Sequence, residues 1–363
     1  MSSEGDFGEP KRTAEGEPIP SWPRALIGGA ISAIPGTEEK HDGSIQTVAV
    51  AFISNLVVAI AKYAGFFAVQ SSALLAEAIH STAVTINQGL MLRGRLTARM
   101  GETPEHSFGF GRERYFWGFM VSVVMFGIGA VLSIGRGVLA LASGEHQDIG
   151  TIWIPYATLT VGLLMDGTSL LQGLRQSRRE KGDLSYKEYL KRSKNPEVPV
   201  VIFEDTAAMF GLFFAYSGIS LTIILGNPLF DALASICVGM VLAVVSSILA
   251  VKMKGLLIGE SALPEEIDFI RSTLDKHEHV REIVYVRSLY LAPDDLLVET
   301  KISMDPELGF RDVATTIDEL ERQIRRKLKH ARLISIEPDV PQEGDVEVPG
   351  FEKDSTDGDS HDG

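Results

Sequence analysis

The chain has 363 residues, of which 45% are hydrophobic and 23% are charged. Both fractions fit one chain when apolar and charged residues occupy different segments. Most of the formal charge of −14 lies at the ends, since residues 1–45 contribute −4 and residues 341–363 contribute −7. The −3 that remains, without a basic stripe, argues against a nucleic-acid partner. The single cysteine, Cys237, excludes a disulfide framework and a cysteine-based zinc cluster.

Two long segments contain no charged residue. Residues 206–230 form a run of 25 and residues 232–251 a run of 20, and about 20 apolar residues in a helix cross a ~30 Å hydrocarbon core. A soluble helical protein with buried helices is the alternative, but the charge alternation of the loops favours membrane spans. With four earlier apolar segments, the sequence predicts six membrane-spanning helices: 46–69, 73–92, 115–141, 152–174, one from about Val198 and one from about Pro228.

Basic residues in the short loops indicate the orientation, because Lys and Arg near the ends of spans are preferentially kept in the cytoplasm. They fill the loop between the second and third spans and the loop between the fourth and fifth. The opposite connections, 70–72, 143–150 and 226–227, contain none. We therefore expect both termini in the cytoplasm.

A small α+β domain is expected after Lys252. Pro264 followed by two Glu is a favourable helix start, because proline suits the first helical position and acids suit the positive end of the helix dipole. The turn-rich residues 292–295 join two β-like runs and predict a hairpin. The predicted order is helix, strand, strand, helix and strand, at about 264–276, 283–291, 296–304, 310–328 and 333–336.

The predicted organisation therefore has four parts. Residues 1–45 and 341–363 are too poor in apolar residues to bury a core and are expected to be disordered tails. Between them we expect a six-helix membrane domain at 46–252 and a cytoplasmic domain at 253–340. The first 45 residues do not resemble an Arg- and Ser-rich, acid-poor presequence, so a bacterial plasma membrane is the expected location.

Ionisable side chains inside the predicted spans mark functional candidates, because each is costly to place in hydrocarbon. Arg136 and Asp231 lie near span ends and are explained as interfacial residues. Lys62 is either an internal counter-ion or a structural residue. The candidates for metal ligands are the other five: Glu77, His80, Asp166, Glu204 and Asp205.

Glu77 and His80 are three residues apart and share one helix face, where imidazole and carboxylate suit zinc or a similar ion. The alternative is a hydrogen-bonded pair that fixes helix packing. Glu204 and Asp205 are adjacent, so their side chains point about 100° apart, and we expect one ligand and one packing or gating partner. Asp166 precedes Gly-Thr-Ser and is expected to face protein, as a ligand or a hydrogen-bond acceptor.

Three motifs give a family resemblance. They are Ser-Ser-Ala-Leu-Leu-Ala-Glu-Ala-Ile-His-Ser at 71–81, His-Ser-Phe-Gly-Phe-Gly-Arg-Glu-Arg-Tyr at 106–115, and Gly-Asn-Pro-Leu-Phe-Asp at 226–231. Over residues 46–340 the chain resembles the cation diffusion facilitator family of divalent-metal/proton antiporters. Phe-Glu-Asp-Thr-Ala-Ala at 203–208 is most similar to the branch that includes the mitochondrial zinc transporter. The resemblance implies six spans and a homodimer with metallochaperone-like cytoplasmic domains.

The resemblance also implies a transport site with two ligands from the second span and two from the fifth, each pair four residues apart. His80 and Asp205 fall on the first positions, while Val84 and Met209 occupy the second ones. A divalent ion in a low-dielectric cavity needs about two negative charges among its ligands. The missing charge is then expected from one of the remaining acids: Glu77, Asp166 or Glu204.

The cytoplasmic domain has its own metal-ligand candidates. His277, His279, Asp294 and Asp295 either bind a regulatory metal or are ordinary residues of surface loops.

The expected function is export of a divalent metal ion from the cytoplasm in exchange for protons, with Zn(II) first and Mn(II), Fe(II) or Co(II) as other cargoes. A metal ligand must lose its proton to bind, so one set of atoms exchanges ion for proton. The expected partners are the metal ion, protons, the lipid bilayer and a second copy of the chain, without a cofactor. The alternative is a transport-dead membrane scaffold that keeps the family fold. An enzyme is not expected, since no hydrolase motif lies within a span.

Overall fold

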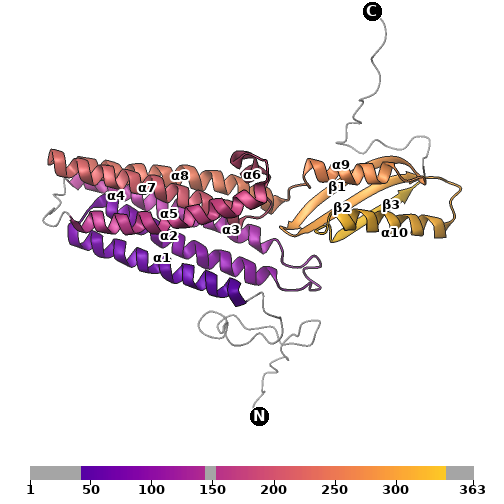
Figure 1. Ribbon diagram of the computed structural model, residues 1–363, viewed down its shortest axis with the longest axis horizontal. Coiled ribbons are helices and arrows are strands. Elements are labelled where there is room, and N and C mark those ends of the chain that lie inside the picture. The colour runs from indigo at the N-terminus through magenta and orange to yellow at the C-terminus, as the bar shows by residue number, and fades with distance from the viewer. Residues whose placement is uncertain (1–41, 144–152, 341–363) are drawn as a thin grey trace, which may run out of the picture. The chain divides into compact units, whose positions relative to one another are not determined.

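The computed structural model describes residues 42–143 and 153–340. The predicted tails lie outside these residues, apart from 42–45, where the first helix begins. The first part of the described chain is helical throughout (Figure 1). Its helices are α1 (Asp42–Val69), α2 (Ser72–Ala98), α3 (Glu113–Val124), the π-helical η1 (Met125–Val131), α4 (Leu132–Ser143), α5 (Trp153–Lys181), α6 (Tyr186–Arg192), α7 (Glu197–Leu225) and α8 (Leu229–Ile258).

Each predicted span coincides with a long helix, and most of these helices extend beyond the apolar run. Helix α8 continues past Lys252, where the sequence predicted the end of the membrane domain, to Ile258. The third helical segment contains the π-helical turn η1 between α3 and α4, which the hydrophobic pattern did not indicate. The short helix α6, in the basic loop before α7, was also not predicted.

Within the described residues, three helical segments are long and apolar enough to cross a membrane: Glu113–Ser143, Glu197–Leu225 and Leu229–Ile258. Helix α1 contributes a shorter apolar stretch, Asn55–Val69. The helices outside this group, α1, α2 and α5, are the ones that carry Lys62, Glu77 and Asp166. The structure therefore supports a helical membrane domain. It identifies three of the six predicted spans by length and apolar composition, and the other three stay a prediction.

The described chain divides into two compact units. The first comprises 42–110, 124–143, 153–167 and 207–243, and the second comprises 111–123, 168–206 and 244–340. In the first unit, α1 packs along α2 (Figure 1). A buried apolar cluster in this unit joins α2, α5, α7 and α8, and includes Leu74, Leu159, Leu212, Ile219 and Ala234.

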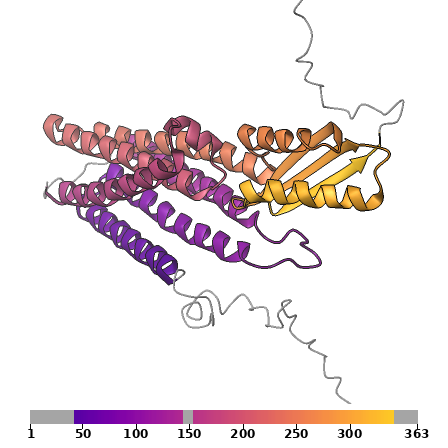
Figure 2. The same ribbon diagram turned by 45° about the vertical axis from the view of Figure 1, so that its right-hand side comes forward.

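The second unit contains the carboxy-terminal domain, whose order confirms the predicted helix, strand, strand, helix and strand. Strand β1 pairs antiparallel with β2, and β3 pairs parallel with β2, so the sheet order is β1-β2-β3. Both helices cover one face of this sheet (Figure 2). The elements are α9 (Pro264–Asp275), β1 (Val280–Ala292), β2 (Asp295–Met304), α10 (Phe310–Lys327) and β3 (Leu333–Asp339).

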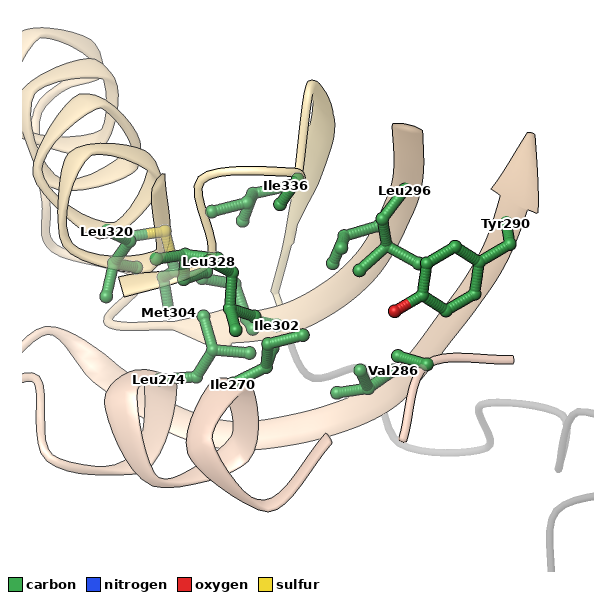
Figure 3. Close-up of a cluster of buried hydrophobic side chains, with 14 residues drawn as sticks. Ile270, Leu274, Val286, Tyr290, Leu296, Ile302, Met304, Leu320, Leu328 and Ile336 are labelled. Atoms are coloured by element: carbon green, nitrogen blue, oxygen red, sulfur yellow. The ribbon is translucent and has the colours of Figure 1, made fainter. Parts of the chain in front are cut away.

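The core of this domain lies between the two helices and the sheet (Figure 3). Alternate residues of β2 face the helices, in agreement with the period of a strand with one buried face. The other face of the sheet carries charged residues, including Lys301, whose ammonium lies 3.1 Å from the Asp339 carboxylate and holds the pKa of that carboxyl below its ordinary value. Buried core side chains come from both helices and all three strands: Ile270, Leu274, Val286, Leu296, Ile302, Met304, Leu320, Ile324, Leu328 and Ile336.

Because every residue of this core lies between 262 and 336, the domain is expected to fold without the membrane helices. We predict that residues 257–340 form a folded domain, and that Leu320→Ala lowers its free energy of unfolding by about 2–5 kcal/mol by leaving a cavity. Urea unfolding followed by circular dichroism measures both. Gln323→Ala, at an exposed position of the same helix, is the matched control and should stay within about 0.5 kcal/mol of the parent. A disordered fragment, or equal losses in the two variants, would contradict the prediction.

Candidate functional site

Helix α2 presents two of the candidate residues, and its start is held in place by a buried carboxylate. Ser71 is the N-cap of α2 and accepts a hydrogen bond from the backbone N–H of Leu74. Asp231, at the start of α8, accepts hydrogen bonds from the Ser71 hydroxyl and from the backbone N–H of Ser72. A carboxylate at this place also favours the positive end of the helix dipole.

The explanation of Asp231 as an interfacial residue is therefore wrong. Its side chain is fully buried, and its own backbone N–H donates to the Thr222 hydroxyl at 3.1 Å. The partners on α2 are about 160 positions away in the sequence, so the hydrophobic pattern around Asp231 held no sign of them. Asp231 fixes the point at which α2 begins.

A buried group of three charged side chains joins α1, α2 and α5. The Lys62 ammonium lies 3.0 Å from Glu77 Oε2 and 3.5 Å from Asp166 Oδ2. Lys62 and Glu77 are completely buried, and the Asp166 side chain is 17% exposed. A buried charge is tolerated only with a partner, and Lys62 supplies one for both acids. As the counter-ion of both acids Lys62 also joins α1 to α2 and α5, so the two roles considered for it coincide.

Two glycines make room for this charged group. A Cβ at position 211, on α7, would overlap Glu77 Oε1, and a Cβ at position 162, on α5, would lie 3.0 Å from Lys62 Cε. The Glu77 carboxylate therefore packs against the backbone of α7, and the end of the Lys62 side chain packs against that of α5. Small residues inside apolar helices are the sequence signal that could have located these contacts.

His80 lies one turn along α2 from Glu77 and is also buried. Among the described residues, neither ring nitrogen of His80 has a hydrogen-bond partner, and the same holds for Glu77 Oε1. Buried polar atoms are normally hydrogen-bonded, so these atoms are exceptions that require an explanation. A nitrogen and a carboxylate oxygen without partners on one helix face suit a divalent metal ion or a proton.

The remaining candidates belong to the second unit. Glu204 and Asp205 on α7 are both buried, and the Ser169 hydroxyl of α5 donates to Asp205 Oδ2 at 2.7 Å. Ser169 was noted in the sequence only as a neighbour of Asp166, and its bond to α7 was not predicted. Since His80 and Asp205 lie in different compact units, their assignment to one site stays a prediction.

No cluster of three or more His, Cys, Asp or Glu side chains suited to a metal ion occurs in residues 42–143 and 153–340. The cytoplasmic candidates are accordingly not gathered into one site. His277 Nε2 lies 3.7 Å from Glu319 Oε2, and the rings of His277 and His279 are 5.6 Å apart. Asp295 instead lies 3.7 Å from Arg332. Each of these residues therefore has a neighbour of its own, and a regulatory metal in this domain stays a prediction.

Comparison with protein families gives two matches that together cover most of the chain. Residues 48–258 match the cation efflux transmembrane domain, and residues 262–339 match the cytoplasmic domain of cation efflux proteins. The boundary between the two matches falls just after the end of α8, a few residues beyond the predicted boundary at 252.

Individual relatives agree with these matches. The chain is 32% identical over 284 residues to human "Proton-coupled zinc antiporter SLC30A9, mitochondrial", covering 77% of this chain and 48% of the relative. The Xenopus laevis protein of the same name is 33% identical over 256 residues, covering 70% and 44%. "Metal tolerance protein C4" of Arabidopsis thaliana is 26% identical over 270 residues, covering 73% and 58%.

The chain spans about half the length of the SLC30A9 relatives that it matches. The predicted resemblance to the branch with the mitochondrial zinc transporter is confirmed. The family match covers more than half of the chain and coincides with the helical part of the structure. The chain is an integral membrane protein that belongs to the cation efflux family.

Proposed function

We propose that this protein exports a divalent metal ion from the cytoplasm in exchange for protons, with Zn(II) as the first cargo and Mn(II), Fe(II) or Co(II) as the others. The observation that carries the proposal is the buried pair of Glu77 and His80, whose unpartnered acceptor atoms lie on α2 of a cation efflux protein. The names of the relatives, a proton-coupled zinc antiporter and a metal tolerance protein, support the same reaction.

The chemistry of the candidate ligands couples the two ions. A neutral imidazole and an ionised carboxylate bind a metal ion, and protonation of either removes a ligand, so metal release is favoured where protons bind. His80 and Asp205, the positions implied by the family resemblance, bring one negative charge. Glu77 is the best source of the second, ahead of Asp166 and Glu204, because it shares one face of α2 with His80 and its Oε1 has no hydrogen-bond partner among the described residues. Nitrogen and oxygen ligands do not select one first-row metal by affinity alone.

We also propose six spans with both termini in the cytoplasm, a membrane domain at 46–252, and assembly of two copies through the domain at 253–340. The loop charges support the orientation, and the match to a cation efflux cytoplasmic domain supports the side on which the second domain lies. A bacterial plasma membrane stays the proposed location, while the names of the SLC30A9 relatives place those proteins in mitochondria.

The six-span topology predicts opposite sides for two connecting segments. In a Cys237→Ser background, Gln70→Cys, between α1 and α2, should react with a membrane-impermeant maleimide added outside intact cells. Asp183→Cys, in the basic loop before α6, should react only after the membrane is opened. The Cys237→Ser parent is the control for background labelling. Labelling of both cysteines from the same side would contradict the topology.

The proposed homodimer is tested by the mass of the isolated cytoplasmic domain in solution. Residues 257–340 should sediment as a dimer at high micromolar concentration and dissociate on dilution, as an assembly formed by this domain requires. Analytical ultracentrifugation over a concentration series is the measurement. If the domain is folded but remains monomeric at every concentration, this domain does not form the dimer contact, and assembly through residues 253–340 is contradicted.

Transport is tested by substitution of the two residues at the ligand positions that the family resemblance implies. His80→Ala and Asp205→Ala should each lower Zn(II) flux into proteoliposomes by at least about tenfold, because each removes a proposed ligand, with expression and oligomer size unchanged. His279→Ala, a partly exposed histidine of the cytoplasmic domain, is the matched control and should keep parental flux. The assay is repeated with Mn(II), Fe(II) and Co(II). A parent that moves none of these ions, and no protons, supports the scaffold alternative instead.

A further inference from the structure

Lys62 has no counterpart among the ligand positions that the family resemblance implies, yet it is the ion-pair partner of two candidate ligands. We propose that Lys62 is a tethered competitor of the transported ion: its ammonium pairs with Glu77 and Asp166 in the metal-free protein, and a divalent ion binds Glu77 by displacing it. This inference rests on the proposed transport function and assigns the residue that sets the affinity of the site.

The first argument is the charge of the buried group. Lys62, Glu77 and Asp166 together carry a net charge of −1, and Lys62 lies within ion-pair distance of both acids. A divalent ion added to the group with the ammonium in place would give a net charge of +1. An uncompensated charge is strongly unfavourable in a buried site. When the ammonium leaves both carboxylates, the ion and the two acids together have a net charge of zero, which favours its departure.

The second argument is that the two carboxylate oxygens of Glu77 differ in their contacts. Lys62 binds Oε2 only, while Oε1 and both nitrogens of His80 have no partner among the described residues. A metal ion can therefore begin to bind at Oε1 and His80 before the ammonium leaves Oε2. The long and flexible stem of a lysine allows its charged end to move without a change in the position of α1.

The third argument concerns release. A transported ion must bind strongly enough to be captured and weakly enough to leave. An ammonium attached to the protein is always present beside the carboxylates and competes at a high effective concentration. It lowers the affinity of the site without removing a ligand, and it takes the place of the ion when the ion departs.

The test compares metal affinities of purified full-length variants in detergent at constant pH. Lys62→Met should bind Co(II) and Zn(II) at least about tenfold more tightly than the parent by isothermal titration calorimetry, a difference of about 1.4 kcal/mol. In Lys62→Met/Glu77→Gln this gain should be lost. Lys252→Met is the matched control, since Lys252 also pairs with a carboxylate, that of Glu260. In this variant Glu260 still has an ion-pair partner, because the Lys194 ammonium lies 2.7 Å from it. Its affinity should remain within about threefold of the parent.

Each outcome decides the proposal. Equal or weaker binding by Lys62→Met overturns it, and so does a double variant that keeps the full gain, because Lys62 then does not act through Glu77. If Lys62→Met is not monodisperse, Lys62→Gln replaces it, as its amide is polar but carries no charge, and the same gain is expected. Flux is measured on the same preparations. A parent that binds Co(II) without transport contradicts the proposed function alone, whereas a parent that binds neither metal overturns both.

Discussion

The structure of the membrane domain depends on the pairing of Lys62 with Glu77 and Asp166. Each of these charges alone would be costly in a low-dielectric interior. Together they allow α1, α2 and α5 to pack against one another with little net charge. The polarity of α1, α2 and α5 belongs to their contacts with each other.

Helix α2 is held at two points, and both hold it through charge. Asp231 binds its first turn, and Lys62 binds Glu77 less than two turns further along. Two fixed points on a rigid helix determine its position along the axis and its rotation, so the direction of His80 follows from them. The buried and unpartnered state of His80 is then a consequence of contacts made by other residues, which agrees with a ligand that is positioned in advance.

The sequence predicted those features that depend on local pattern. Long apolar runs, two of them free of charge, located the membrane helices. The period of two in β2 and of about 3.6 in α10 located the carboxy-terminal domain, including its hairpin. It also selected the candidate acids and His80, since ionisable residues in apolar runs are conspicuous. The partners of these residues lay beyond local pattern. The contacts of Asp231 with Ser71 and of Lys62 with Glu77 join segments separated by 160 and 15 positions, and only the packed helices bring them together. The π-helical η1 and α6 likewise had no periodic signal.

The charge of a metal site is determined by bases as well as by acids. A count of carboxylates alone suggests that Val84 and Met209 leave the site short of ligands and that any nearby acid fills the gap. Inclusion of Lys62 changes this count, because Glu77 and Asp166 are already shared by one ammonium. Two acids that face one lysine offer a divalent ion a single net negative charge until the lysine moves. An apolar residue at position 84 is then compatible with ion binding, since the charge that a carboxylate there would contribute can instead be exposed by movement of Lys62. On this view the strength of binding depends on the energy needed to separate an ion pair that the fold already contains, and it changes with whatever moves α1 relative to α2.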